Sequence, residues 1–226
     1  SLIQKQIEDY IEKCDQTKNE ILAELDELIG SEEKNRIEIE QLKENYRSAR
    51  KTLLAHQYSF GPALVQLEKL VEELPEKFDE YEKLTKEGNY LKAREIVLLL
   101  TEKSQHIFHL ITEVPSLLTE IQTKIPTAIY ELKSGQREME EKSYYLHHLE
   151  LTDHLEELEK ELEKLQEEIA NLNVSYVATR IEEINDEIDN YYDLLEKEVY
   201  AKSYVDQNTD STYEILNEVM RSTKEI

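Results

Sequence analysis

Few residues that break helices or cross-link a chain occur in this sequence. Its 226 residues include four glycines, four prolines, one cysteine and no tryptophan, whereas 35% of them are charged. This composition is typical of extended helices and does not suit a β-sheet or a globular α/β enzyme. A single cysteine excludes an internal disulfide bond and favours a reducing compartment.

Long apolar runs are missing as well. The sequence has no stretch of about 18 apolar residues, so it predicts no membrane-spanning segment, and no signal peptide is recognisable. Because the first residue is Ser1 and a heptad pattern is already present at Ile7, we interpret the sequence as a piece of a longer protein. Any membrane segment would then lie outside this piece, which we expect to be soluble.

Positive charge is scarce. The sequence has 27 Lys and Arg residues against 51 Asp and Glu residues, which gives a net charge of −24. A chain of this charge repels nucleic acids and anionic lipid surfaces, so non-specific binding to either is not expected. The charge also opposes the class of helical modules that curve membranes through a basic, lipid-facing surface.

The dominant pattern is a heptad repeat over residues 89–142. It predicts one long helix packed against other helices, about 80 Å long at about 1.5 Å per residue. Pro115 and Pro126 lie within it and should bend it. A helix of this length favours an element that ends one helical bundle and begins the next. The predicted seam consists of Ala93, Val97, Leu100, Ser104, Ile107, Ile111, Val114, Leu118, Ile121, Ile125, Ala128 and Leu132.

Residues 2–58 carry a similar seam, which begins with Ile7, Ile11, Cys14, Ile21, Leu25 and Leu28. Gly30 either ends this helix or lies within it. The spacing of apolar residues continues unchanged past Gly30, which favours one continuous helix with the glycine on its outer face. Pro75 predicts a kink in the helix that follows.

We predict an all-α fold, an elongated rod of spectrin-like antiparallel three-helix bundles joined by long shared helices. A loose repeat of Tyr90-x-x-Ala93-Arg94 as Tyr176-x-Ala178-x-Arg180 supports two such bundles. The expected segments are 1–30 (last helix of a preceding repeat), 31–114 (repeat one, helices about 31–58, 62–87 and 89–114), 115–200 (repeat two, helices about 115–142, 151–172 and 175–200) and 201–226 (start of a further repeat, or a frayed end with 206–211 frayed or turning).

No arrangement of residues predicts catalysis. His106 and His109 have helical spacing, but Ile107 in the seam places both on the outer face, where a supported metal site is hard to build. Cys14 lies in the seam and is expected to be a buried, small apolar residue. The sequence has no Gly-rich phosphate loop and no recognisable catalytic triad. We therefore predict neither an enzyme nor a bound metal or cofactor.

One local exception to the acidity is the basic cluster, which we define as Lys43, Arg47, Arg50 and Lys51. The first three have helical spacing and share one flank of their helix. Such a patch on an acidic chain can hold an acidic segment of a partner. Alternatively, these side chains form salt bridges to Glu-rich neighbours across the bundle. The sequence leaves both interpretations open.

Several short motifs resemble the EzrA family of septation ring formation regulators, over roughly residues 20–200. The matching segments are Ser31-Glu32-Glu33-Lys34, Tyr46-Arg47-Ser48-Ala49-Arg50-Lys51-Thr52-Leu53-Leu54-Ala55, Gly88-Asn89-Tyr90-x-x-Ala93-Arg94 and Val114-Pro115-x-Leu117-Leu118. The last 25 residues match less clearly, and the family's C-terminal patch is not recognisable, so no functional residue is carried over.

The resemblance implies a cytoplasmic scaffold that is tethered to the membrane by a helix missing from this piece. Such a protein acts at the division septum, binds the tubulin-like protein FtsZ, limits misplaced ring assembly and links ring components to wall-synthesis proteins. The alternative is a purely mechanical helical spacer, of spectrin-like or chromosome-organising type, with no partner site in this piece. In either case we expect this piece to be monomeric.

Overall fold

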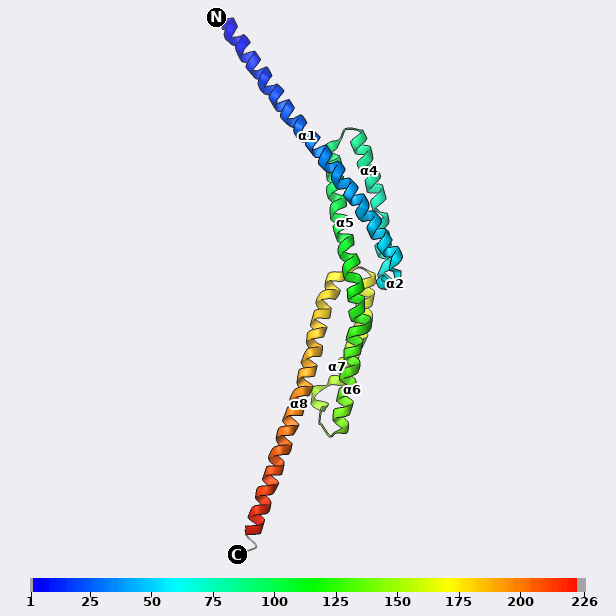
Figure 1. The fold of residues 1–226 in the computed structure, drawn as a ribbon, viewed down its shortest axis with the longest axis vertical. Helices are drawn as coiled ribbons and strands as arrows, with labels where there is room; N and C mark the ends of the chain where they lie inside the picture. Colours follow the sequence, from blue (N-terminus) through cyan, green and yellow to red (C-terminus); the bar gives the residue numbers. More distant parts are fainter. Residues whose placement is uncertain (1, 223–226) are drawn as a thin grey trace. The chain divides into compact units, whose positions relative to one another are not determined.

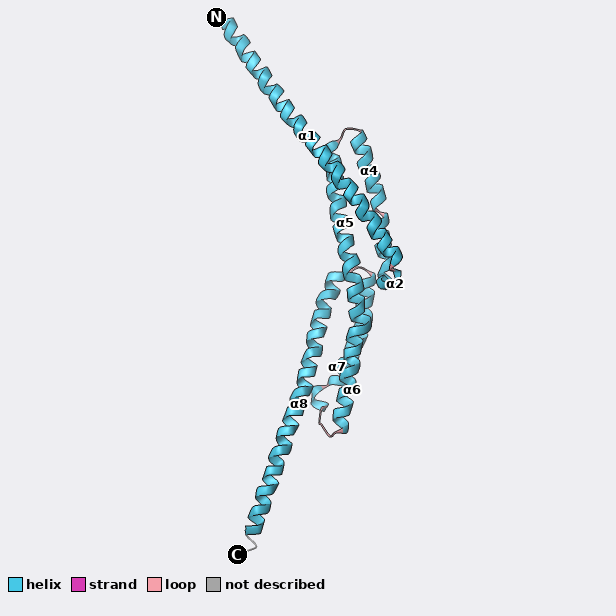
Figure 2. Cartoon of the chain, in the orientation of Figure 1, coloured by secondary structure: helices cyan, strands magenta, loops and turns pink. Residues whose placement is uncertain are grey.

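The structure, a computed structural model, describes the backbone of residues 2–222 and the side chains of residues 5–26 and 29–222. Every regular element in this described range is helical, which confirms the all-α prediction (Figure 2). The chain divides into two compact units. Unit 1 comprises Ser1–Phe60 and Leu64–Thr112, and unit 2 comprises Gly61–Ala63 and Glu113–Ile226. The assignment of residues 31–114 and 115–200 as spectrin-like repeats stays a prediction.

Unit 1 is built from α1 (Leu2–Ala55), α2 (Gln57–Phe60), α3 (Leu64–Glu72), α4 (Leu74–Lys86) and the first part of α5 (Tyr90–Thr119). The second half of α1, the α3–α4 stretch and α5 lie side by side within the unit (Figure 1). Their apolar faces supply its core, which includes Ile39, Leu42, Ala49, Leu53, Leu67, Val71, Leu74, Phe78, Tyr81, Ala93, Val97, Leu100, Ile107 and Leu110.

The helix predicted over residues 62–87 is interrupted at Glu73, so it forms two helices, α3 and α4. Pro75 lies in the first turn of α4. Because proline has no N–H, it cannot bond to the carbonyl of Val71, and its ring crowds that carbonyl. The predicted disturbance near Pro75 is therefore confirmed. The chain enters α3 through a 3₁₀ turn, Gly61–Ala63, which belongs to unit 2 and packs on α7 (Leu151–Ala170).

α1 continues through Gly30, which confirms the prediction of a continuous helix. The glycine is exposed, and a Cβ added to it would have nothing within 4 Å. The first part of α1 differs from the prediction, however. Ile7, Ile11 and Cys14 are exposed, and so are Ile21 and Leu25.

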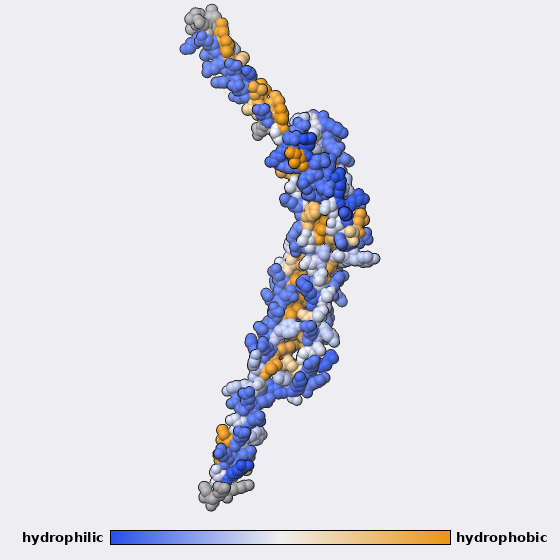
Figure 3. All heavy atoms as spheres, in the orientation of Figure 1, coloured by the Kyte–Doolittle hydropathy of each residue, from blue (hydrophilic) through white to orange (hydrophobic). Residues whose placement is uncertain are grey.

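The prediction that Cys14 is buried is therefore wrong, because no other described element packs against residues 5–26. Figure 3 shows hydrophobic side chains along this exposed stretch of α1. The side chain of Leu28, also assigned to the seam, lies outside the described residues.

Gly30→Ala is expected to stabilise α1 by about 0.5–1 kcal/mol, since alanine loses less backbone entropy in a helix than glycine and nothing obstructs its methyl group. Amide hydrogen exchange around residue 30 should slow. Gly88 provides the opposite control. Its φ is +75°, so Gly88→Ala should destabilise the turn after α4. Faster exchange in Gly30→Ala would contradict a continuous helix at this position.

Unit 2 contains the end of α5, a π-helical turn at Glu120–Lys124, α6 (Ile125–Glu141), a 3₁₀ turn at His147–Leu149, α7 and α8 (Val174–Ser222). α6, α7 and the first half of α8 lie side by side (Figure 1). Their buried faces include Ile125, Ile129, Leu132, Leu151, Leu155, Leu158, Leu162, Leu165, Ile169, Val174, Val177, Ile181, Ile184, Ile188 and Leu195.

The seam of the long central helix departs from a strict heptad at two positions. Ile111 and Ala128 are only half-buried, whereas Leu110 and Ile129 are buried. The steps from Ser104 to Ile107 and from Ile107 to Leu110 are both three residues, so the buried face turns here in the direction opposite to the drift of a straight 3.6-residue helix against a heptad. The shift from Ala128 to Ile129 follows from the π turn, because a wider turn contains one more residue before the chain returns to the same face.

The two prolines of this helix have different surroundings. α5 continues through Pro115 as an α-helix. Pro126 follows the π turn, in which the N–H of Ile125 donates to the carbonyl of Glu120, five residues back. Pro126 has no N–H to donate, so the regular series of i to i−4 hydrogen bonds is already interrupted at this point. Prolines and π turns are both common where a helix departs from this series.

α8 is longer than predicted. The prediction that residues 206–211 fray or turn is wrong, because this segment lies within a helix that ends at Ser222. The segment contains neither proline nor glycine. Its polar side chains bond within the helix: Asn208 Nδ2 donates to the carbonyl of Tyr204 at 2.8 Å, and Thr212 Oγ1 donates to the carbonyl of Asn208 at 2.7 Å.

Candidate functional site

The basic cluster lies on the half of α1 that packs into unit 1. Lys43 is directed towards α4, where its Nζ lies 3.2 Å from Oε1 of Glu82, and it also lies 3.5 Å from Glu40. Burial opposes the charged form of Lys43, but the hydrogen bond to Glu82 and the charges of Glu40 and Glu82 outweigh it and raise the pKa of Lys43. For this residue, the structure agrees with salt bridging across the bundle.

The other three cations face solvent. Arg47 Nη1 lies 3.2 Å from Glu44 of the same helix, and its side chain is 65% exposed. Arg50 Nη1 donates only a long bond, 3.5 Å, to the hydroxyl of Tyr46. Lys51 is exposed and forms no hydrogen bond or ion pair within the part of the chain that the structure describes. Among the described residues, Arg50 and Lys51 therefore have no carboxylate partner, and each can receive one.

A shallow cavity of about 100 Å³ lies beside Arg50, between α1 and α3. Its walls include Tyr46, Leu54, Glu68 and Glu72, and Leu54 is 59% exposed. The ring of Tyr46 packs edge-on against Phe78 of α4, with centroids 6.1 Å apart, which holds this wall in place. The arrangement can receive one apolar side chain next to the guanidinium of Arg50. It remains a prediction that a partner binds the basic cluster.

The repeated Tyr–Arg motifs provide helix-to-helix contacts that sequence analysis did not assign. Arg94 Nη1 donates to Oδ1 of the buried Asn35 at 3.0 Å and also pairs with Glu38 of α1. Arg180 of α8 donates twice to Glu161 of α7, at 2.6 and 2.9 Å. The motif spacing was visible in the sequence, but the acidic partners come from other helices and could not be identified from it.

Arg180 also donates to Glu183 and Glu187, each at 2.9 Å. Its hydrogen bond to Glu161 raises the pKa of Arg180 and lowers the pKa of Glu161. Of these partners, Glu161 lies on α7 and fastens α8 to it, whereas Glu183 and Glu187 lie on α8 itself.

The turn between α6 and α7 is also fastened to α8. Lys202 donates to the carbonyl of Lys142, and its ammonium group lies 4.3 Å from the ring centroid of Tyr144. His148 Nε2 lies 3.1 Å from Glu198. We interpret this turn as a structural contact within unit 2.

The histidine pair of α5 is the clearest candidate for metal binding that the sequence offers. His106 and His109 are exposed, as predicted. Within the described residues, no three or more His, Cys, Asp or Glu side chains gather closely enough to hold a metal ion. None of the described helices combines the length and the apolar character needed to cross a membrane.

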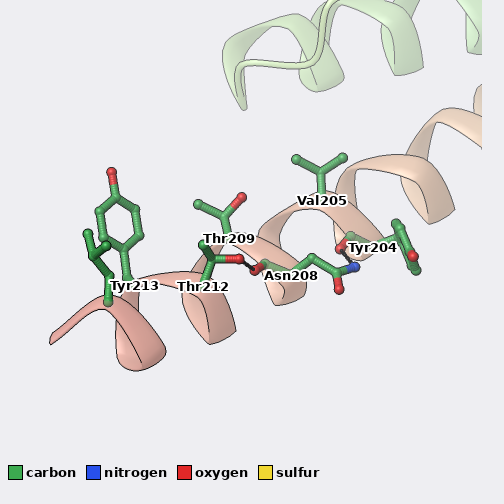
Figure 4. A pocket seen from close by; sticks show the side chains of 7 residues that line it. Tyr204, Val205, Asn208, Thr209, Thr212 and Tyr213 are labelled. Atoms are coloured by element: carbon green, nitrogen blue, oxygen red, sulfur yellow. Dashed lines mark hydrogen bonds between the residues drawn. The ribbon is translucent and has the colours of Figure 1, made fainter. Parts of the chain in front are cut away.

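A hollow of about 430 Å³ lies along the end of α8 (Figure 4). All of its lining residues, among them Tyr204, Val205, Thr209 and Tyr213, come from this one helix. A surface formed by one helix cannot enclose a small molecule, which needs a concave site. It is suited instead to contact another helix.

These features define an all-helical protein in which helix surfaces are the candidate functional parts. The family model of the septation ring formation regulator EzrA matches residues 2–226. The chain therefore belongs to the EzrA family, as the sequence motifs indicated. This family consists of regulators of septation, a step of cell division, and not of enzymes.

Curated relatives carry the name septation ring formation regulator EzrA. The protein of Geobacillus sp. (strain WCH70) is 40% identical over 221 residues, which cover 98% of this chain and 39% of the relative. That of Geobacillus kaustophilus is 39% identical over 220 residues, covering 97% and 39%. That of Listeria welshimeri is 33% identical over 210 residues, covering 93% and 37%. The chain thus spans about two fifths of these relatives. No solved structure matches it.

Proposed function

We propose that this chain is part of a membrane-tethered cytoplasmic scaffold that restrains assembly of the FtsZ ring through protein–protein contacts. The observation that carries the proposal is the EzrA family match over residues 2–226. The tether and further partner surfaces would lie in the rest of the full-length protein, because the relatives are more than twice as long. The scaffold would act at the septum, on the cytoplasmic side of the membrane.

We further propose that residues 31–114 and 115–200 are two spectrin-like repeats of an elongated rod. Three helical stretches contribute to the core of each compact unit, and α5 supplies residues to both. Residues 1–30 and 201–226 would pack in neighbouring repeats. Their exposed apolar side chains, such as Ile11 and Leu216, support this assignment.

The contact to FtsZ would be made by the solvent-facing members of the basic cluster. In the part of the chain that the structure describes, Arg50 and Lys51 have no carboxylate partner, and Arg47 pairs with Glu44 of its own helix. An acidic segment of an FtsZ subunit can therefore bind here without breaking a contact between helices. The mechanism would be steric and competitive, since a bound rod occupies surface that FtsZ polymers need for growth or bundling.

The test is co-sedimentation of the chain with FtsZ polymers. Arg50→Glu/Lys51→Glu is expected to lose at least about tenfold in affinity, because two favourable charge contacts become repulsive. Lys43 is left unchanged, since its reversal would break the contact with Glu82. Lys83→Glu/Lys92→Glu is the matched control, with the same charge change at two other exposed positions, and should bind normally.

Equal binding by both variants would remove the basic cluster from the proposal while keeping FtsZ as the partner. Absence of binding by the unmodified chain would favour the second candidate function, a mechanical spacer. The spacer hypothesis is supported by the exposed, uniformly helical surfaces of the described residues, which need no partner site.

A further inference from the structure

The face of unit 1 between α1 and α5 contains an open groove of about 360 Å³. Gln41, Leu42 and Asn45 line it from α1, and Leu98, Ser104 and Phe108 line it from α5. Leu98 is 53% exposed although it lies directly beside the core. We call this feature the neutral groove, because the only charged residues that line it, Glu38 and Arg94, pair with each other at one end.

Ion pairs join the other neighbouring helices of unit 1. Lys43 of α1 reaches Glu82 of α4 at 3.2 Å, and Lys103 of α5 reaches Glu73 at 3.1 Å. Between α1 and α5, the described residues show no hydrogen bond or ion pair beyond the Arg94 network. Although 35% of the residues in the chain are charged, the groove beyond the Glu38–Arg94 pair is lined by uncharged residues, and among the described residues no further hydrogen bond or ion pair joins α1 to α5.

Ser104 provides an independent observation in the floor of this groove. The residue is 4% exposed, and its Oγ has no hydrogen-bond partner. Its neighbour Thr101, in contrast, bonds to the carbonyl of Val97 at 2.8 Å, as hydroxyls in helices usually do. A buried hydroxyl without a partner costs stability, so Ser104 lowers the stability of the packing between α1 and α5.

We propose that the neutral groove is a docking site for one α-helix of a partner protein, with an uncharged docking face of small and aliphatic residues. A helix fits a groove between two helices by inserting side chains three and four residues apart. Leu98 and Phe108 offer apolar contacts, and the amides of Gln41 and Asn45, which already bond to each other at 3.1 Å, offer further hydrogen bonds.

The charges around the neutral groove favour an uncharged helix over a charged one. Any charge brought into the groove would lose hydration without meeting an opposite charge, because Glu38 and Arg94 neutralise each other. An uncharged docking face avoids this cost. The docking site is independent of the basic cluster and does not require that FtsZ bind there.

The test uses a designed helical peptide as the probe, with Ala, Leu and one Ser on the docking face and Lys and Glu elsewhere. A twin peptide carries Glu in place of two docking-face leucines. In nitrogen-15 NMR spectra, the side-chain amide signals of Gln41, Asn45 and Gln105 report directly on the groove. We expect saturable shifts of these signals below about 1 mM peptide, and no shifts with the twin.

Two variants separate docking from folding. Leu98→Glu changes an exposed side chain, so the fold should persist while peptide binding falls at least tenfold. Ser104→Ala should raise the melting temperature, because it removes an unpaired buried hydroxyl, and should leave peptide binding within about twofold, because the Oγ atom is not accessible from the groove. Three results would each overturn the proposal. The first is NMR shifts confined to Arg47–Lys51, the second is shifts that appear with protein concentration alone, and the third is unchanged peptide binding by Leu98→Glu.

Discussion

Ile107→Asp is expected to destabilise unit 1 strongly. Ile107 is 2% exposed and lies where α5 faces the core. The substitution removes a buried aliphatic side chain and places an unpaired carboxylate in an apolar site, which together should cost at least about 4 kcal/mol. Because domains of this size are stable by only about 5–15 kcal/mol, this loss is a large part of the total, and amide protection should fall by about a thousandfold throughout residues 35–112. Denaturant unfolding with hydrogen exchange checks both the size and the place of the loss.

Ile111→Asp is the matched control. A heptad assigns Ile111 to the seam as firmly as Ile107, but the structure leaves it half-buried, with Leu110 in the core instead. Its carboxylate can reach water, so the loss should stay below about 2 kcal/mol. Equal losses for the two variants would mean that α5 packs by the heptad and not by the observed face.

Arg180→Met is expected to destabilise unit 2 by about 2–3 kcal/mol. The side chain of Arg180 is 21% exposed, and it donates to Glu161, Glu183 and Glu187. Methionine preserves much of the side chain's apolar length but leaves three carboxylates close together without a cation. Arg137→Met, at an exposed position of α6, should change stability by less than about 0.5 kcal/mol. Urea unfolding measures both values.

The same contact predicts a pH dependence. Arg180 lowers the pKa of Glu161 in the folded protein, so this pair stabilises the fold fully above the unfolded pKa of about 4.3. Its contribution is lost as the pH falls through the lower, folded pKa. The stability difference between the unmodified chain and Arg180→Met should therefore shrink below about pH 4. A difference that grows with acid would contradict the assignment of the pair.

Local sequence patterns were sufficient to predict the helices and most of the core. The run from Leu151 to Ile169 has apolar residues at helical spacing and good helix formers between them, so it reads correctly as α7 without any knowledge of its partners. Errors arose where the answer depends on a second element. Cys14 has the seam spacing of a buried residue but is exposed, because no described helix covers it.

The surface features were harder to predict, because they depend on how distant helices meet. The spacing of Lys43, Arg47 and Arg50 placed them on one flank but did not show that only Lys43 would reach α4. The neutral groove has no sequence signature. Its uncharged residues are spread over two helices, and the unusual state of Ser104 follows from missing contacts and not from its type.

The π turn at Glu120–Lys124 also bears on how chains of this kind tolerate insertions and deletions. Removing one residue from most helices rotates every later side chain by about 100° and misplaces the core. Here the buried residues Ile121, Ile125 and Ile129 are separated by steps of four. Loss of an exposed residue such as Gln122 would turn the π turn into an ordinary α-turn while both flanking cores keep their alignment. This short segment is therefore a point where chain length can vary during evolution without redesign of either side.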